Sequence, residues 1–305
     1  MSDVGFADNP FNLEQLLTDH GFRRSAGKTW SDAADRWIMT TSHKADHLHD
    51  LQKLDWLARH FADLPLTAIN EDLILRVSYI KKMESSPSTA NRYLALIRAI
   101  LRASRDEWRW VHWIPPIKFF PEPEHRVRWL KPHEARRLIA ELPPHLSAMA
   151  RFSLATGLRQ SNVAYLQWNQ VDIYRRVAWV NAADSKSRRS FAVPLNNSAL
   201  AVLQEQRGQH NNFVFVYKGK PVGRCSTAAW SKAKDRANIE DFRWHDWRHT
   251  WASWHVQNGT SLYELQELGG WKTLDMVLRY AHLAGDQLMT AASRIDKNCH
   301  LAFPH

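Results

Sequence analysis

Cysteine is scarce in this chain. Only Cys225 and Cys299 occur among its 305 residues, so the sequence offers no disulfide framework. It also contains no CxxC or HExxH motif and no cluster of cysteine with histidine, although its 16 histidines are scattered along the chain. Zinc sites in proteins are built from such closely spaced ligands. We therefore expect neither a disulfide-stapled fold nor a zinc site.

Long apolar runs are absent as well. No stretch of about eighteen apolar residues occurs, so we expect no transmembrane helix and no membrane partner. The first residues, MSDVGFADNPFNLEQLL, lack the basic region followed by an apolar run that marks a secretory signal peptide. On these grounds we expect an intracellular, cytoplasmic protein.

Positive charge and tryptophan, by contrast, are abundant. Lysine and arginine number 41 against 31 aspartates and glutamates, which gives a formal net charge of +10. This balance favours a polyanionic partner such as nucleic acid, although a merely basic enzyme explains the charge alone equally well. The 15 tryptophans are expected mostly in or against a core, because each carries a large apolar surface.

Helical periodicity runs from Trp30 to Val111 and predicts a small bundle of four helices. The segment HLHDLQKLDWLARHF places apolar residues on one face, namely Leu48, Leu51, Leu54, Leu57 and Phe61. The last predicted helix carries arginines on its polar face. The candidate DNA contacts there are Arg92, Arg98 and Arg102. An ordinary solvated surface is the alternative interpretation of that face.

A proline-rich stretch separates this bundle from the rest of the chain. Residues 112–127, HWIPPIKFFPEPEHRV, hold four prolines and predict an extended, rather stiff linker. The sequence-based division is therefore a short N-terminal extension (1–25), a helical domain (26–111), the linker (112–127), a second domain (128–295) and a C-terminal tail (296–305).

The second domain mixes helices with a little antiparallel sheet. The stretch RRVAWVNAADSKSRRSFAVPL predicts two strands, 177–181 and 190–194, around a polar turn. Other segments of this domain have helical patterns, including HDWRHTWASWHVQNG, which ends at a glycine suited to a helix C-terminus. The expected fold class is mainly α with a small antiparallel β-sheet, an α+β domain that follows a helical bundle.

Four short stretches carry polar and aromatic side chains that could take part in a reaction. TGLRQS places Arg159 after a glycine at a helix start, and DSKSRRSFAVPL places Lys186 in the strand-to-strand turn. HDWRH places His245 and Arg248 three residues apart, on one side of a helical turn. GGWKTLDMVLRYAH supplies the last pair, Trp271 and Tyr280. Taken alone, each has an ordinary structural explanation, such as a core tyrosine or a surface ion pair.

Together and in this order, these stretches resemble the tyrosine recombinases of the phage integrase family. The resemblance covers the chain from about Trp30 to about Ile295. It places the family's active-site positions on Arg159, Lys186, His245, Arg248, Trp271 and Tyr280. It implies that a tyrosine attacks a DNA phosphodiester, forming a 3′-phosphotyrosyl link and a free 5′-hydroxyl, with no cofactor and no metal ion.

The resemblance also implies a role for each side chain. Tyr280 is the expected nucleophile, which needs a base or a positive field because a phenol has a pKa of about 10. Arg159 and Arg248 are expected to clamp the non-bridging phosphate oxygens. The expected general acid is Lys186, although Arg188 and Arg189 in the same turn are further candidate DNA contacts. His245 is expected to assist proton transfer, and Trp271 to pack the pocket and donate one hydrogen bond.

Partners and alternatives follow from the same resemblance. It implies duplex DNA and a homotetramer acting on two paired sites in a bacterial or phage setting, associated with the nucleoid, and it leaves room for accessory DNA-bending proteins. One departure is Asn162, which stands where the family often has an acidic residue. The alternatives are a DNA-relaxing enzyme similar to type IB topoisomerases and a catalytically inactive DNA-binding relative.

Overall fold

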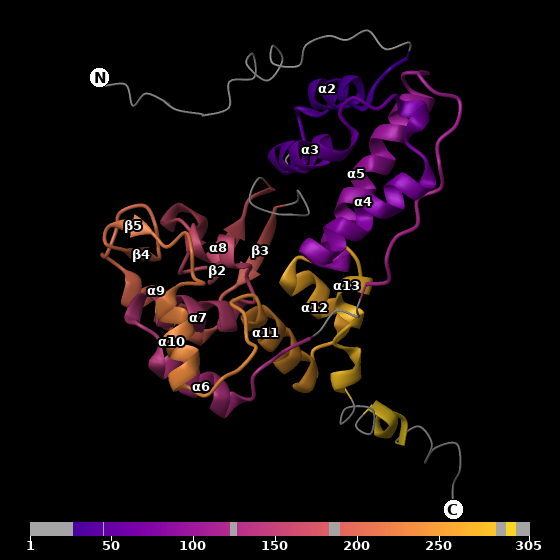
Figure 1. The fold of residues 1–305 in the computed structure, drawn as a ribbon. Coiled ribbons are helices and arrows are strands. Elements are labelled where there is room, and N and C mark those ends of the chain that lie inside the picture. The colour runs from indigo at the N-terminus through magenta and orange to yellow at the C-terminus, as the bar shows by residue number, and fades with distance from the viewer. Residues whose placement is uncertain (1–26, 45, 123–126, 183–189, 285–290, 297–305) are drawn as a thin grey trace, which may run out of the picture. The chain divides into compact units, whose positions relative to one another are not determined.

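A computed structural model describes residues 27–44, 46–122, 127–182, 190–284 and 291–296. Contacts divide the chain into two compact units, Met1–Glu124 and His125–His305 (Figure 1). Helices dominate both units, and the strands form two small antiparallel sheets in the second. This is the fold class that the sequence predicts. Within the described residues, no helix is both long and apolar enough to cross a lipid bilayer.

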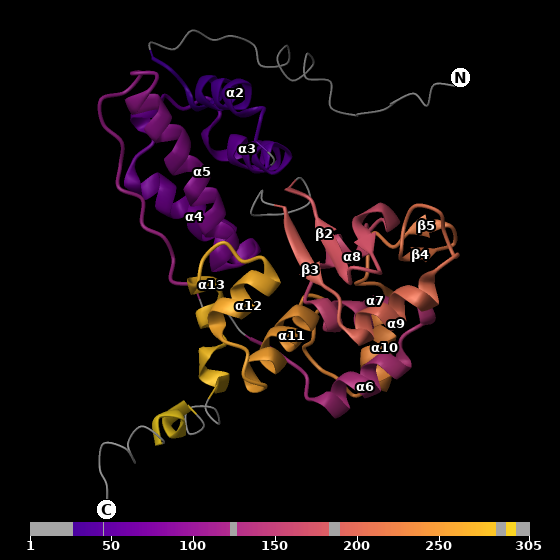
Figure 2. The same cartoon turned by 180° about the vertical axis from the view of Figure 1, so that it is seen from behind.

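The N-terminal unit is built from helices with short connections. Its elements are α2 (Trp30–Thr41), α3 (His47–Phe61), the 3-10 helix η1 (Leu66–Ala68), α4 (Glu71–Glu84) and α5 (Pro87–Asp106). Capping side chains define several helix starts, because Thr29, Asn70 and Ser86 each accept a hydrogen bond from a backbone N–H of the first turn. Helices α4 and α5 pack side by side (Figures 1 and 2).

The apolar faces of these helices meet in one core. Its most buried members include Trp30, Leu57, Phe61 and Ile97. The apolar face predicted for α3 is correct at Leu54, Leu57 and Phe61, which are all buried. Leu48, in the first turn of the same helix, is 70% exposed, so the predicted stripe is one turn too long.

The described part of the proline-rich stretch is extended and packs on the N-terminal unit. Val111 is buried in the core of this unit, and Ile114, Ile117 and Phe120 pack against it. Asn91 on α5 fixes the stretch twice, since its amide donates to the Phe120 carbonyl and accepts from the Phe120 N–H, both at 2.9 Å. Contacts therefore place these residues with the first unit, and the linker role predicted for residues 112–127 stays a prediction.

The C-terminal unit holds the remaining elements. They are α6 (Pro132–Glu141), α7 (Pro144–Thr156), α8 (Gln160–Ala164), η2 (Trp168–Gln170), β1 (Val171–Asp172), β2 (Val177–Val180), β3 (Phe191–Pro194), α9 (Asn197–Gln206), β4 (Val216–Tyr217), β5 (Lys220–Pro221), α10 (Ala228–Arg236), α11 (Asp246–Gln257), α12 (Leu262–Gly269), α13 (Asp275–Leu278), η4 (Ala281–Ala284) and η5 (Ser293–Ile295). Helix α7 packs against both α9 and α11 (Figure 2).

The larger sheet has the strand order β1-β2-β3, and all of its pairings are antiparallel. The two predicted strands, 177–181 and 190–194, are confirmed to within one residue, and Val180 pairs with Phe191 at the end of their ladder. Strand β1 has only two residues and leaves too short a pattern to be recognised in the sequence. The turn that joins β2 to β3 contains residues 183–189, which lie outside the described residues.

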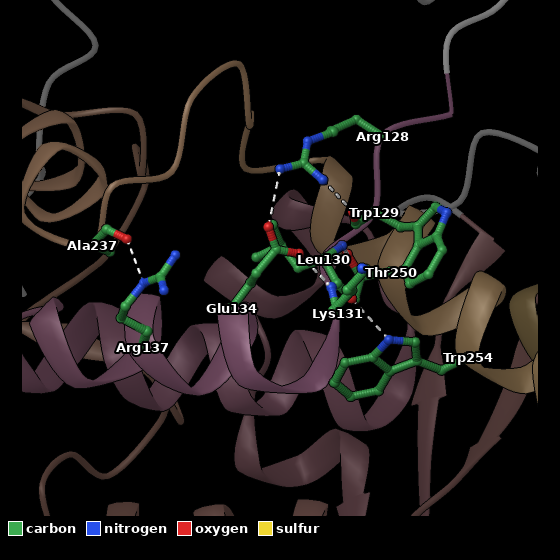
Figure 3. A network of polar contacts seen from close by, with 9 residues as sticks. All are labelled: Arg128, Trp129, Leu130, Lys131, Glu134, Arg137, Ala237, Thr250 and Trp254. Carbon is green, nitrogen blue, oxygen red and sulfur yellow. Dashed lines mark hydrogen bonds and ion pairs between the residues drawn. The ribbon is translucent and has the colours of Figure 1, made fainter.

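The chain enters the C-terminal unit along α11 (Figure 3). The Leu130 N–H donates to Thr250 Oγ1 at 3.2 Å, and Trp254 Nε1 donates to the Leu130 carbonyl at 2.9 Å. Just beyond, Glu134 in the first turn of α6 accepts from the Lys131 N–H at 2.7 Å. The two bonds of Leu130 hold α11 beside the start of α6, and α11 carries Arg248 and His249 of the site described next.

Candidate active site

The first predicted site residue stands where α7 ends and α8 begins. Gly157 caps α7 with a φ of +64°, a left-handed conformation that glycine adopts without strain. A Cβ at this position would lie 2.2 Å from the Trp251 ring, so the close approach also requires glycine. The turn places Arg159 at the N-cap position of α8. The glycine of the TGLR stretch is therefore structurally required beside the arginine.

Helix α11 carries the second arginine on its buried face. Arg248 is only 3% exposed. Its Nη1 donates to the carbonyl of Gly157 at 2.5 Å, and its Nη2 donates to the carbonyl of Gly269 at 2.6 Å. Burial, with a smaller contribution from the charge of Arg159, lowers the pKa of Arg248 to about 9, so the guanidinium stays charged at neutral pH. The two carbonyls orient this group without cancelling its charge.

Trp271 lies against Arg248. The guanidinium carbon is 3.9 Å from the centroid of the indole, a cation–π contact. The same indole stacks on Trp251, with ring centroids 6.0 Å apart and planes 26° apart. Gly269 leaves room for this arrangement, because a Cβ there would lie 1.9 Å from the Trp271 ring. The LGGW stretch therefore supplies an aromatic ring, the space that it needs and a carbonyl for Arg248.

Tyr280 follows the short helix α13 and is 1% exposed. Its ring centroid lies 6.1 Å from that of Trp271, and its phenol oxygen lies 2.6 Å from Nδ1 of His249. Burial raises the pKa of Tyr280 to about 12, although the charge of Arg248 acts in the opposite direction. The phenol is therefore protonated at neutral pH and needs a proton acceptor to become a nucleophile.

Arg159 retains unused hydrogen-bonding capacity. Its Nη1 is buried and has no partner within the described residues. Burial also lowers the pKa of this guanidinium. In the described part of the chain, neither Arg159 nor Arg248 forms an ion pair with a carboxylate. A buried cationic N–H without a partner is costly, so this geometry suits an incoming anion.

His245 stands at the N-cap position of α11. Its ring meets that of His249 edge to face, with centroids 5.3 Å apart. Desolvation, followed by the charges of His249 and Arg248, lowers the pKa of His245, even though the residue keeps a solvent-exposed edge. The direction of this shift leaves the imidazole neutral at pH 7, able to donate from one ring nitrogen and accept at the other.

The residues singled out from the sequence fall into three groups. Five of the six predicted site residues form a continuous cluster within the C-terminal unit, namely Arg159, His245, Arg248, Trp271 and Tyr280. The sixth, Lys186, lies outside the described residues, as do Arg188 and Arg189. Arg92, Arg98 and Arg102 belong to α5 in the N-terminal unit. Within the described ranges, no group of three or more His, Cys, Asp or Glu side chains is placed to hold a metal ion.

Sequence reasoning missed His249. It follows Arg248 directly in the HDWRH stretch and lies one helical turn after His245, so the spacing could have placed both histidines on one face of α11. Its contact with Tyr280 joins residues 31 positions apart, which local patterns do not reveal. The departure noted at Asn162 is a buried position, 7% exposed, on α8 beside Arg159.

Known proteins resemble this chain in sequence. Residues 128–286 match the model of the phage integrase family. The chain is also 38% identical to the integrase of Salmonella phage P22 over 309 aligned positions, which cover 88% of this chain and 80% of that protein. These matches favour a recombinase over the topoisomerase-like alternative, and the family-model match spans all six predicted site positions.

Solved structures share the fold. A lambda integrase dimer bound to a COC′ core site aligns with a TM-score of 0.69 at 16% identity, covering 83% of this chain and 95% of that one. A lambda integrase tetramer bound to a Holliday junction aligns with a TM-score of 0.68 at 16% identity, covering 87% of this chain and 83% of that one. At this level of identity, the likeness is one of fold.

Proposed function

This chain belongs to the phage integrase family and is a site-specific tyrosine recombinase, and from that premise we propose that Tyr280 is the nucleophile that cuts DNA. The Tyr280 oxygen attacks a phosphodiester and forms a 3′-phosphotyrosyl bond as the bond to the 5′ oxygen breaks. A 5′-hydroxyl, from the same strand or a partner strand, then attacks the phosphotyrosyl bond and releases the tyrosine. Because the ester bond is conserved throughout, neither step needs a nucleotide cofactor.

The arginines are the proposed ligands of the phosphate. Negative charge concentrates on the non-bridging oxygens as the pentavalent transition state forms, and a planar guanidinium can donate to two oxygens at once. Arg159 has a buried, unpartnered Nη1 within the described residues, and Arg248 acts electrostatically on the Tyr280 phenol. The observation that carries the proposal is that three distant segments meet here, since Arg248 acts on the buried phenol and Arg159 acts on Arg248.

His245 and Trp271 complete the proposed phosphate site. A neutral His245 can hydrogen-bond the phosphate and assist proton transfer, and its exposed edge leaves the ring accessible to DNA. The indole ring of Trp271 packs against the Arg248 guanidinium in a cation–π contact. Its indole N–H can donate one hydrogen bond but cannot accept or shuttle a proton. We assign Trp271 a packing and hydrogen-bonding role only.

Lys186 is the proposed general acid that protonates the leaving 5′ oxygen. The strands on either side of its turn, β2 and β3, are hydrogen-bonded up to the pair Val180 and Phe191, so the turn starts from a fixed base. A lysine ammonium can supply the proton that the leaving 5′ oxygen needs. Arg188 and Arg189 in the same turn are proposed to contact the DNA backbone.

The proposed partner is duplex DNA, bound in the cytoplasm of a bacterial host by both units. Arg92 and Arg102 on α5 are exposed, which suits contacts to phosphates. A homotetramer on two paired sites is proposed from the likeness to the lambda integrase tetramer. Accessory DNA-bending proteins are compatible with this scheme, because bending a short DNA site costs energy that a second protein can supply.

A suicide DNA substrate tests the assignment of the nucleophile. Its cut strand carries a nick, so the short fragment diffuses away and the covalent complex accumulates. Tyr280→Phe should bind this substrate with an unchanged Kd and form no adduct. The matched control is Tyr263→Phe, which alters a 70% exposed tyrosine on α12 and should form adduct as the unaltered protein does. An adduct that persists in Tyr280→Phe would assign the nucleophile to another residue.

A further inference from the structure

The shortest polar contact of the proposed nucleophile is with a residue outside the six predicted site positions. His249 Nδ1 lies 2.6 Å from the Tyr280 oxygen, and the two ring centroids are 5.8 Å apart. At this distance the contact is a hydrogen bond with one shared proton. His249 is half-buried on α11, between His245 one turn before it and the loop that carries Tyr280.

The direction of this hydrogen bond depends on the tautomer of His249. Burial raises the pKa of Tyr280, so the phenol holds its proton at neutral pH and has it to donate. A neutral imidazole accepts at one nitrogen and donates from the other, so in the tautomer with the ring proton on Nε2 the phenol donates to Nδ1. The pair is therefore arranged for transfer of the phenol proton to His249.

His245 cannot fill this position in the same geometry. Its ring meets the His249 ring edge to face, with centroids 5.3 Å apart, and the hydrogen-bond partner of the Tyr280 oxygen is His249. His245 is also the more exposed of the two histidines. This arrangement leaves His245 for the phosphate and His249 for the nucleophile.

We propose that His249 is the proton acceptor that activates Tyr280, an assignment that rests on the recombinase chemistry proposed above. As the Tyr280 oxygen forms its bond to phosphorus, the phenol proton moves to His249 Nδ1, and the 5′ oxygen leaves with a proton from the general acid. In the rejoining step, a 5′-hydroxyl attacks phosphorus and gives its proton back to the general acid, while the Tyr280 oxygen leaves and takes back its proton from His249. Proton and bond changes balance over the two steps.

The charged surroundings of the pair bear on its pH dependence. The charged groups that act on Tyr280 are Arg248 and Asp246 on α11 and Arg279 beside it. His245, the N-cap residue of α11, interacts with His249 and is itself acted on by Arg159 at the start of α8. Protonation of His249 at acid pH would occupy Nδ1 and block the transfer. The rate of cleavage should therefore fall as the pH is lowered.

Two substitutions separate proton transfer from positioning. In His249→Asn, the side-chain amide can still offer an oxygen near the place of Nδ1, so a hydrogen bond to Tyr280 survives, but the amide cannot take up a proton. His249→Phe removes both functions. The matched control is His255→Asn, because His255 is another half-buried histidine on α11, with its Nδ1 bonded to Thr260 Oγ1 at 2.9 Å.

The measurement is the single-turnover rate of adduct formation on the suicide substrate between pH 5.5 and about pH 9.5, a span that brackets ordinary histidine titration. His249→Asn should bind DNA as the unaltered protein does. Its rate of cleavage should be lower by at least about 100-fold, which is the contribution expected of a general base. Its acid-side fall should vanish, and its rate should climb about tenfold per pH unit as the phenol ionises unaided. His255→Asn should stay within about twofold of the unaltered protein.

A second substrate, in which sulfur replaces the bridging 5′ oxygen, shows whether a variant is impaired in protonating the leaving group or in deprotonating the nucleophile. Sulfur leaves without a proton, so this substrate should restore cleavage to Lys186→Ala and should not restore it to His249→Asn. Rescue of His249→Asn would overturn the proposal, as would near-normal cleavage by that variant with an unchanged pH profile. Adduct formation by Tyr280→Phe would instead refute the proposed function, so the two failures are distinguishable.

Discussion

The arginines of α5 and those of the C-terminal site differ in what surrounds them. On α5, Arg92 and Arg102 are exposed, and Arg98 lies over the Phe119 ring at 4.4 Å. In the C-terminal unit, Arg248 is buried and bonded to two backbone carbonyls, and Arg159 keeps a buried nitrogen without a partner in the described residues. The exposed arginines of α5 can change conformation when DNA binds, whereas the arginines of the C-terminal site are held in place before DNA binds.

This difference separates binding from catalysis. Flexible surface cations contribute to DNA affinity through counterion release, and each contact is weak and dependent on salt. Preorganised cations in a buried site stabilise charge that develops during the reaction, because they need no rearrangement at that moment. The two regions should therefore respond to substitution in different ways, and the predictions below run from the largest expected effect to the smallest.

Arg248→Lys should have the largest effect. A lysine cannot reproduce the fork that reaches both Gly157 and Gly269, so cleavage should slow by about 10³-fold, as for loss of a preorganised arginine. The free energy of unfolding should also fall by about 1–3 kcal/mol, because buried carbonyls lose their partners. Adduct formation and urea unfolding measure the two effects. The same change at Arg92 on α5 is the control, and equal behaviour of the two variants would remove the distinction between the regions.

Arg159→Ala should slow cleavage by about 10²–10³-fold without lowering stability. The reason is that its Nη1 is buried without a partner in the described residues, so the folded protein loses no hydrogen bond there. Urea unfolding and single-turnover cleavage, measured on the same preparation, test the claim. A loss of more than about 1 kcal/mol in the free energy of unfolding would mean that Arg159 is structural.

The double variant Arg92→Ala, Arg102→Ala should change affinity and not chemistry. If each arginine meets one phosphate, the slope of log K against log salt should become shallower by about 1.8, at roughly 0.9 per contact. Cleavage at saturating DNA should stay within about twofold of the unaltered rate. Fluorescence anisotropy over a series of salt concentrations gives the slope. An unchanged slope would show that this face of α5 does not meet DNA phosphates.

The smallest effect should come from His245 on acid stability. Because desolvation lowers its pKa in the folded protein, the unfolded chain binds the proton more readily. The contribution of neutral His245 to the free energy of unfolding is therefore complete above about pH 6.5, and it is lost as the pH falls below that value. His245→Gln should flatten this part of the curve of unfolding free energy against pH. A curve that keeps its slope would place the acid sensitivity in other histidines, such as His255, whose pKa burial also lowers.

The sequence predicted elements where short patterns are decisive. The two strands around the Lys186 turn are a local feature, and the structure confirms them. Leu48 was wrongly assigned to the core because periodicity shows which face of a helix is apolar but not how far its partners extend. Strand β1 was missed because two residues are too few to show the alternation of apolar and polar residues that marks a strand.

The candidate site was predictable only in part, for a similar reason. Motif order located Arg159, Arg248 and Tyr280, the side chains to which we assign the phosphate contacts and the nucleophilic attack. The supports of those side chains depend on contacts between distant segments. Gly269 as a hydrogen-bond acceptor for Arg248, and His249 as a partner of Tyr280, appear only once the chain is folded.

The two carbonyls that hold Arg248 have a practical consequence. Carboxylates in their place would have neutralised the guanidinium, whereas peptide oxygens leave a full unit of charge inside the site. The resting recombinase should therefore attract small inorganic oxyanions as well as the nucleic acid backbone. Sulfate or phosphate in a buffer would compete for the same position, so the choice of anion, and not ionic strength alone, should govern the activity observed in an assay.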